Sequence, residues 1–180
     1  MLLDEITPLV LTKNEAPNIG RCLEKLRWAR RVVVLDSGSA DDTVAIARSF
    51  PNAEVHHRPF DNHTDQWNHG VGLVDAPWVL SLDADYILTG GLIEEVRALA
   101  PGGDAAAYFI RFRYCVGGRP LRGSLYPPRA ALFRRDRCRY IDDGHTQLLE
   151  ARGATATLAG EIWHDDRKPL GEWAANQEIG

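Results

Sequence analysis

The chain has 180 residues, of which 44% are hydrophobic and 26% charged, and its formal net charge is −4. This composition is typical of a single globular domain and excludes a disordered or fibrous chain. The mild excess of acid argues against nucleic acid as a partner, because such binding depends on a basic surface. No apolar run reaches the roughly 18 residues that a membrane-spanning helix needs.

The beginning of the chain and its cysteines both favour a cytoplasmic protein. Asp4 and Glu5 stand where a secretory signal carries a basic segment, so we do not expect export. The three cysteines are far apart and form neither a disulfide framework nor a zinc-binding spacing. We expect them to be reduced thiols.

The first half of the chain alternates strands and helices. Apolar runs that end at polar residues predict strands at 6–12, 32–35, 53–57 and 78–82. Apolar residues at helical spacing, with capping residues before them, predict helices at 17–28, from Asp41 or Asp42 to Phe50, at 64–74, and from Thr89 to Leu99. Strands that alternate with helices indicate an α/β fold with a mostly parallel sheet.

The second half has a different pattern. Residues 107–114 and 130–134 alternate apolar and polar side chains, which predicts antiparallel or edge strands, with residues 117–120 in a loop between them. Residues 170–179 resemble the start of an amphipathic helix that ends abruptly with the chain, and the sequence leaves open whether a continuation beyond residue 180 is missing. We therefore expect one α/β domain over residues 1–180, with flanking helices and an irregular, partly antiparallel C-terminal part.

Polar side chains follow three of the predicted parallel strands. Thr12, Asn14 and Glu15 follow the first, Asp36 and Ser37 follow the second, and Asp83-Ala84-Asp85 follows the fourth. Ligands of open α/β sheets bind at the carboxyl ends of the strands, so these side chains mark a candidate site. Each of them alone would be explained as a helix cap or a turn residue.

The acidic pair Asp83 and Asp85 suggests a metal bound together with a diphosphate. Mg²⁺ and Mn²⁺ prefer oxygen ligands, usually one or two carboxylates completed by phosphate oxygens of the substrate. A dinucleotide-binding fold is disfavoured, because no Gly-x-Gly-x-x-Gly turn follows the first strand, and there is no Walker loop.

Taken together, these stretches resemble the GT-A-fold glycosyltransferases of family 2, in particular bacterial lipopolysaccharide-core glucosyltransferases. The resemblance rests on an ordered set of segments: residues 11–15, 33–43, Asn68, 80–85, 131–135 and 162–164. It extends over nearly the whole chain and is strongest over residues 6–100. It implies a GT-A-like fold, with a nucleotide-sugar-binding half over about 1–100 and a half over about 101–180 that completes the acceptor and metal sites.

The resemblance also implies the roles of individual residues. Those expected to bind the nucleotide-sugar donor are Thr12, Asn14, Glu15, Asp36, Ser37, Asn68 and Asp83. Those expected to bind Mn²⁺ or Mg²⁺ are Asp85, Asp83 and His164, although His164 is equally well explained as the start of a polar turn. Residues 117–128 are expected to form a mobile loop over the donor.

The general base is where the sequence departs from its relatives. Many of them carry a His-Glu or Glu-Asp pair after the Phe-Arg-Arg strand, and here Thr146 stands in place of the glutamate. Threonine is not a base, so the candidates are Asp143, which we favour, then His145 and Asp142. A second departure is Tyr86, where relatives often carry an acid.

The prediction is thus a metal-dependent inverting glycosyltransferase. It would move a hexose from a nucleoside diphosphate sugar, with UDP-sugar favoured, to a lipid or saccharide acceptor of the cell envelope. Nine arginines between residues 111 and 139 suggest contact with an anionic acceptor or with the inner face of the cell membrane, although ordinary surface ion pairs also explain them. Alternative predictions are an inactive nucleotide-sugar-binding module and a sugar nucleotidyltransferase.

Overall fold

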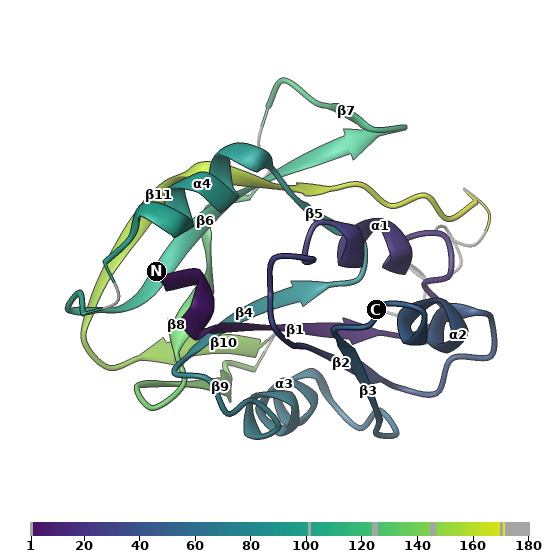
Figure 1. The fold of residues 1–180 in the computed structure, drawn as a ribbon, viewed down its shortest axis with the longest axis horizontal. Coiled ribbons are helices and arrows are strands. Elements are labelled where there is room, and N and C mark those ends of the chain that lie inside the picture. The colour runs from purple at the N-terminus through teal and green to yellow at the C-terminus, as the bar shows by residue number, and fades with distance from the viewer. Residues whose placement is uncertain (1, 101, 124–125, 145–146, 170, 172–180) are drawn as a thin grey trace.

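A computed structural model describes residues 2–100, 102–123, 126–144, 147–169 and 171. Four parallel strands form one side of its central sheet, in the order β3-β2-β1-β4 (Figure 1). They are β1 (Ile6–Thr12), β2 (Val32–Asp36), β3 (Ala53–His57) and β4 (Trp78–Asp83). All four strands predicted from the first half are confirmed, with bounds that differ by at most one residue.

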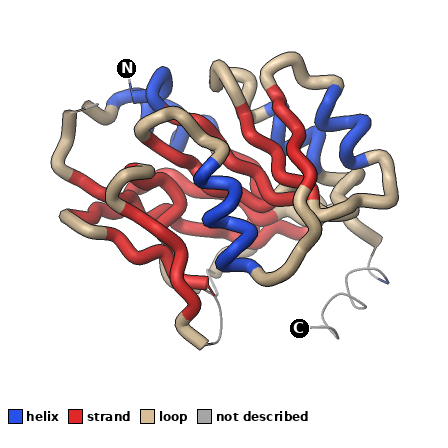
Figure 2. The backbone as a smooth tube through the Cα atoms, turned by 90° about the horizontal axis from the view of Figure 1, so that it is seen from below, coloured by secondary structure: helices blue, strands red, loops and turns tan. Residues whose placement is uncertain are grey.

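The parallel strands are buried on both faces because helices cover both. Even-numbered residues of β2, Val32 and Val34, belong to one core cluster, and the odd-numbered Val33 and Leu35 belong to another. The first cluster packs against α1 (Ile19–Glu24) and α4 (Gly90–Ala98), and the second against α3 (His63–Gly72) (Figure 2). The continuous apolar runs therefore reflect strands between two layers of helices.

The four helices predicted in the first half are all present, but they are shorter than predicted. α1 ends at Glu24 rather than Trp28, yet Leu26 and Ala29 remain buried in the turns that follow it. At α2 (Thr43–Arg48) Asp41, not Asp42, supplies the side-chain oxygen, which accepts a hydrogen bond from the Thr43 amide at 3.0 Å. At α4 Thr89 accepts a bond from the amide of Leu92, as predicted.

The sheet continues through strands of mixed direction. They are β8 (Arg129–Arg134), β6 (Ala105–Val116), β11 (Ala154–His164) and β5 (Tyr86–Leu88), in the order β4-β8-β6-β11-β5. The antiparallel pairing of β6 with β8 confirms the alternating patterns. β11 is parallel to β6, and it brings the C-terminal part of the chain back into the central sheet.

Four further elements were not predicted, in addition to β5 and β11. The segment 117–120, expected to be a loop, contains a short strand, β7 (Arg119–Pro120), which pairs with β6. A separate hairpin consists of β9 (Cys138–Asp142) and β10 (Gln147–Ala151). A short 3₁₀ helix covers Leu2–Glu5. The predicted helix at 170–179 lies, except for Gly171, outside the described residues.

The cysteines and Pro8 are two smaller features of the fold. Cys22, Cys115 and Cys138 are free and buried, as expected for reduced thiols. Pro8 is in a central strand, but it lies before the pairing of β1 with β2 begins at Leu9, so its missing amide removes no bond of that ladder. Within the part of the chain that the structure describes, no helix is long and apolar enough to cross a membrane.

Candidate active site

The sheet register brings the ends of β1, β2 and β4 into one row. Thr12 lies opposite Asp36 in the pairing of β1 with β2, and Leu11 lies opposite Asp83 in the pairing of β1 with β4. Thr12 and Asp36 are buried. The backbone therefore places the polar ends of these parallel strands at one edge of the sheet, as predicted.

β11 adds a histidine to this edge from a distant part of the chain. Its last residue, His164, pairs with Tyr86 of β5, directly after Asp85. The imidazole Nε2 lies 2.8 Å from a carboxylate oxygen of Asp85, and the Asp165 amide donates to the Asp85 carbonyl at 3.1 Å. Two predicted metal ligands, Asp85 and His164, are thus in contact, although 79 positions separate them.

The electrostatics of this cluster are those of crowded, partly buried charges. Burial and, next, the charge of Asp85 together raise the pKa of Asp83 to about 6. Burial would lower the pKa of His164, but the hydrogen bond to Asp85 and the two carboxylate charges raise it above its usual value. The cluster thus gathers negative charge that a cation would neutralise.

The donor set suits a divalent ion that the substrate helps to hold. As they stand, the described residues contain no group of three His, Cys, Asp or Glu side chains placed to bind a metal ion. Carboxylates and an imidazole are nevertheless ligands that Mn²⁺ accepts, and a substrate diphosphate supplies further oxygens. The residues therefore fit a metal that binds together with its substrate.

Two of the predicted donor-binding residues connect the loops after β1 and β2. Asn14 has a φ of 53°. Its amide donates to Ser39 Oγ, and its side-chain oxygen accepts from the Ala40 amide, both at 2.8 Å. Asp36 accepts from the amides of Gly38 and Ser39 at 2.9 and 3.0 Å. Gly38 has a φ of 95°, a conformation that favours glycine.

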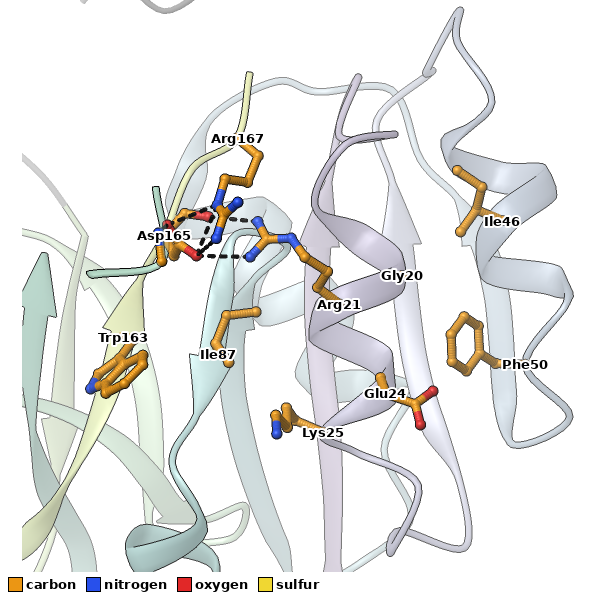
Figure 3. Close-up of a pocket in the computed structure, with 11 residues that line it drawn as sticks. Gly20, Arg21, Glu24, Lys25, Ile46, Phe50, Ile87, Trp163, Asp165 and Arg167 are labelled. Carbon is orange, nitrogen blue, oxygen red and sulfur yellow. Dashed lines mark hydrogen bonds and ion pairs between the residues drawn. The ribbon is translucent and has the colours of Figure 1, made fainter. Parts of the chain in front are cut away.

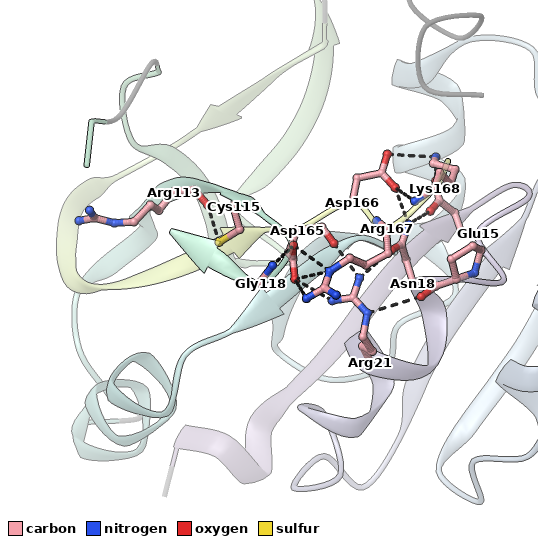
Figure 4. A network of polar contacts seen from close by, with 11 residues as sticks. Glu15, Asn18, Arg21, Arg113, Cys115, Gly118, Asp165, Asp166, Arg167 and Lys168 are labelled. Carbon is pink, nitrogen blue, oxygen red and sulfur yellow. Dashed lines mark hydrogen bonds and ion pairs between the residues drawn. The ribbon is translucent and has the colours of Figure 1, made fainter. Parts of the chain in front are cut away.

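Glu15 belongs to a polar network that the sequence did not indicate (Figure 4). Its carboxylate accepts from Asn18 Nδ2 at 2.8 Å and pairs with Lys168 Nζ at 2.5 Å. Asn18 is fully buried, donates to Asp166 at 2.8 Å and accepts from the Arg167 amide at 2.9 Å. The segment after β11 is therefore fixed to the loop after β1.

Asp165 is the second centre of this network. It is buried, and its carboxylate accepts from Arg21 at 3.0 Å, from Arg167 and from the Gly118 amide at 3.1 Å. These ion pairs hold the pKa of Asp165 below its usual value despite the opposing effect of burial. Four adjacent charged residues, 165–168, were read as a polar turn, and only the structure shows their partners.

Asn68 and Ser37 also have protein partners. Asn68 is on α3, and its side-chain amide both donates to the carbonyl and accepts from the amide of Tyr140, at 2.9 Å each. It therefore holds β9 against α3. Ser37 Oγ accepts from Gln66 Nε2 at 3.0 Å. Asn68 is connected to the candidate site by its bonds to β9. It does not belong to the row of strand ends formed by Thr12, Asp36 and Asp83.

A cavity of about 310 Å³ opens beside Asp83. Its walls include Ser81, Tyr86 and Arg129, together with Tyr140 and the start of β10 at Gln147. The Tyr140 hydroxyl donates to Ser81 Oγ at 2.9 Å, and its ring stacks on Trp67 at 5.4 Å. The hairpin of β9 and β10 thus forms one wall of a cavity that contains a predicted site residue.

Two of the candidate bases, Asp142 and Asp143, lie where β9 ends, at the turn of this hairpin. Asp142 ends β9, and its side chain accepts from the Gly144 amide at 2.8 Å. Asp142 and Asp143 are exposed, and neither belongs to the described lining of the cavity. His145 and Thr146 lie outside the described residues.

A larger cavity, of about 610 Å³, lies beside α1 (Figure 3). Its lining includes Arg21, Phe50, Ile87 and Trp163. No residue predicted to bind donor or metal lines it. The smaller cavity, which Asp83 lines, is therefore the candidate active site.

Comparisons with known proteins identify the family. The model of "Glycosyl transferase family 2" matches residues 9–158. The lipopolysaccharide core biosynthesis glycosyltransferase LpsC of Rhizobium meliloti is 28% identical over 136 residues, which cover 73% of this chain and 48% of LpsC. Several Rickettsia glycosyltransferases match about half of this chain and about a third of their own length. The chain thus spans half or less of the length of these curated relatives.

Solved structures show the same fold. Staphylococcus aureus TarS 1–349 in complex with UDP-GlcNAc superposes with a TM-score of 0.69 and 16% identity, over 91% of this chain and 59% of that one. Glucosyl-3-phosphoglycerate synthase of Mycobacterium tuberculosis, in complex with Mn²⁺, UDP and phosphoglyceric acid, has a TM-score of 0.60 and 17% identity, over 96% and 74%. With a family model that matches most of its length and a GT-A fold, this chain belongs to glycosyl transferase family 2.

Proposed function

We propose that this chain is the catalytic part of a metal-dependent inverting glycosyltransferase. It moves a hexose from a nucleoside diphosphate sugar, with a UDP-sugar favoured, to a lipid or saccharide acceptor. The observation that carries the proposal is the contact of Asp85 with His164 beside Asp83, in the row of strand ends. The lipopolysaccharide role of LpsC supports cell-envelope glycan synthesis, on the cytoplasmic side of the membrane.

The donor would lie across the ends of β1, β2 and β4. Thr12, Asn14, Glu15, Asp36 and Ser37 would bind the base and ribose. The loops after β1 and β2 are joined by the bonds of Asn14, so this half of the site is held before the donor binds. Such preorganisation lowers the ordering cost of binding.

Asp85, Asp83 and His164 would hold Mn²⁺ or Mg²⁺ against the diphosphate. When bound, the ion stabilises the negative charge that develops on the departing nucleoside diphosphate. Burial and the charge of Asp85 raise the pKa of Asp83, which shows that these carboxylates repel each other. Their geometry therefore favours a cation.

Transfer needs one base and no nucleophilic residue of the protein. The acceptor hydroxyl oxygen attacks the anomeric carbon, the bond from that carbon to the diphosphate oxygen breaks, and the hydroxyl proton passes to a general base. We assign that base to Asp143, at the turn of the hairpin that lines the cavity, with His145 and Asp142 as alternatives.

Calorimetric titration tests this function. The purified protein is titrated with UDP-, GDP- and dTDP-sugars, each with and without Mn²⁺. We expect binding of one base that strengthens with Mn²⁺. A folded protein that binds none of these donors would contradict the proposal.

One observation favours a second candidate, an inactive nucleotide-sugar-binding module. Neither Asp142 nor Asp143 belongs to the described lining of the cavity. Metal-dependent donor binding, without transfer or hydrolysis of the sugar over a broad panel of acceptors, would identify such a module. A sugar nucleotidyltransferase is the least supported, because the loop Asn14-Glu15-Ala16-Pro17 is not glycine-rich.

A further inference from the structure

The hairpin of β6 and β7 exposes apolar side chains. Val116 is 68% exposed and Leu121 is 43% exposed, on either side of the turn Gly117-Gly118 and the short strand β7. Figure 1 shows this hairpin standing out from the body of the sheet. Single exposed apolar residues are common, but Val116 and Leu121 together form a small apolar patch on a projecting hairpin, here called the apolar tip.

The same hairpin lies in the most basic part of the chain. Residues 105–135 contain seven arginines and no Asp or Glu, in a chain whose net charge is −4. Arg113 is paired with Glu161. Arg119 and Arg122 are exposed, and neither has an acidic partner within the described ranges. Two arginines that have no acidic partner among the described residues therefore flank the apolar tip.

The hairpin is on the same edge of the sheet as the candidate active site. β4 and β6 are both antiparallel to β8, so β6 ends at the edge where β4 delivers Asp83. Tyr114, near the end of β6, packs against His164 with ring centroids 4.6 Å apart. The Gly118 amide donates to Asp165 at 3.1 Å, which holds the turn to the segment after His164.

We propose that the hairpin 116–122 docks on an anionic lipid bilayer. Val116 and Leu121 enter the interface between head groups and acyl chains, and Arg119 and Arg122 bind lipid phosphates. Lipid phosphates are complementary to these two cations, and the interface accepts apolar tips that carry basic neighbours. The candidate active site, on the same edge, then faces the lipid surface. The lipid surface would present the acceptor to this site. Binding of the hairpin to lipid can be measured without sugar transfer.

Flotation of the full chain with vesicles tests the proposal. Vesicles of phosphatidylcholine with about one third phosphatidylglycerol should bind the protein, and binding should weaken with added salt. The double variant Arg119→Gln/Arg122→Gln should lower the partition coefficient about 30-fold, because each surface cation contributes roughly a factor of five. Pure phosphatidylcholine vesicles should bind the wild type much more weakly.

A matched control separates the hairpin from overall charge. Arg48→Gln/Arg135→Gln gives the same net charge, and both residues are exposed. Arg48 ends α2, and Arg135 lies beside Pro77 before β4, so both are at the opposite edge of the sheet. This variant should bind anionic vesicles within about twofold of the wild type. An equal loss in both double variants would overturn the proposal.

The apolar tip needs its own variant. Val116→Ser/Leu121→Ser keeps every charge and should still lower the partition coefficient, by about tenfold, because apolar burial is lost. Far-UV circular dichroism and the melting temperature confirm that each variant is folded. No flotation of the wild type with anionic vesicles, or full binding by the serine variant, would contradict docking by this hairpin.

Discussion

Asp83 and Asp85 differ in their surroundings although only Ala84 separates them. Asp83 lines the cavity and has a pKa raised by burial and by its acidic neighbour. Asp85 is buried against His164. Removal of either charge relieves repulsion, but only the loss of Asp85 also leaves the imidazole without its carboxylate. The two acids should therefore be separable by mutation.

We predict that Asp85→Ala abolishes the Mn²⁺-dependent part of donor binding. The substitution removes a carboxylate that would hold the metal and the partner of His164. Calorimetry with the preferred nucleotide sugar, with and without Mn²⁺, measures the effect. Asp75→Ala is the control, since this side chain is 94% exposed. Unchanged metal dependence in Asp85→Ala would exclude this residue as a ligand.

We predict that Asp143→Asn spares donor binding and lowers kcat by about 100-fold or more, as expected for the loss of a general base. Asp136→Asn, another exposed aspartate, serves as the control. Turnover is measured by release of nucleoside diphosphate with an acceptor present. Wild-type kcat in Asp143→Asn would transfer the role to His145 or Asp142.

At the scale of elements, α3 and the hairpin of β9 and β10 act as one unit. Asn68 bonds both backbone groups of Tyr140, and Trp67 stacks on the Tyr140 ring. This attachment fixes the wall of the cavity and the turn that carries Asp142 and Asp143. These bonds allow Asn68 to position the hairpin, in addition to the donor contact that the family resemblance implies.

Asn68→Ala distinguishes these two roles. Loss of the two bonds should lower the free energy of unfolding by about 1–3 kcal/mol. If Asn68 positions the hairpin, kcat falls while the donor Kd stays within about twofold. If Asn68 binds the donor, the Kd rises instead. Asn62→Ala is the control, because it removes a cap at the other end of α3 without touching the hairpin.

α4 and β11 approach closely at Gly160. A Cβ atom at this position would lie 2.6 Å from Leu92 Cα, and the Gly160 amide donates to Glu95 at 2.7 Å. The pairing of β6 with β11 is irregular between Thr157 and Glu161, which admits the helix. Only a residue without a side chain allows this contact.

Gly160→Ala should therefore lower the free energy of unfolding by about 1–3 kcal/mol, since backbone must move to admit the methyl group. Urea unfolding followed by tryptophan fluorescence measures the change. Gly91→Ala in α4 is the control, because nothing lies within 4 Å of its added Cβ. That variant should be neutral, or more stable by up to about 1 kcal/mol.

At the scale of the whole molecule, β11 joins the two halves of the chain. It pairs with β6 from the second half and with β5 from the first, and the segment after it is bonded to Asn18 and Arg21 near the N-terminus. One continuous sheet runs from β3 to β5. These connections predict a single cooperative unit rather than two separable halves.

The unfolding transition checks this prediction. Urea curves from tryptophan fluorescence and from far-UV circular dichroism should coincide, with one midpoint. A donor-binding half that melted separately would give two transitions, or curves that differ between the probes. Arg21→Ala should shift both curves together, because it removes ion pairs between α1 and Asp165.

Local patterns in the sequence were sufficient for the strands of the first half, for the cap Thr89, and for the alternating strands β6 and β8. At α2 they left Asp41 and Asp42 open, and the structure shows that Asp41 accepts the bond. These patterns reflect the burial of side chains and the hydrogen bonding of the backbone at helix ends, both of which depend on neighbours close in sequence. The same patterns placed Thr12, Asp36 and Asp83 at strand ends, and therefore at one edge. β5, β7, β9, β10 and β11 were missed. All of them except β11 have only two to five residues, which carry too little periodicity.

Contacts between residues far apart in the sequence were decided only by the tertiary structure. The sequence by itself determined an α/β chain with acids at the ends of parallel strands and, through its motifs, its family. It did not determine that β11 returns to the sheet, that His164 meets Asp85, that Lys168 pairs with Glu15, or that Asn68 holds Tyr140. Each of these contacts joins residues at least 48 positions apart, and no pattern within a single element records which distant partner a side chain will have.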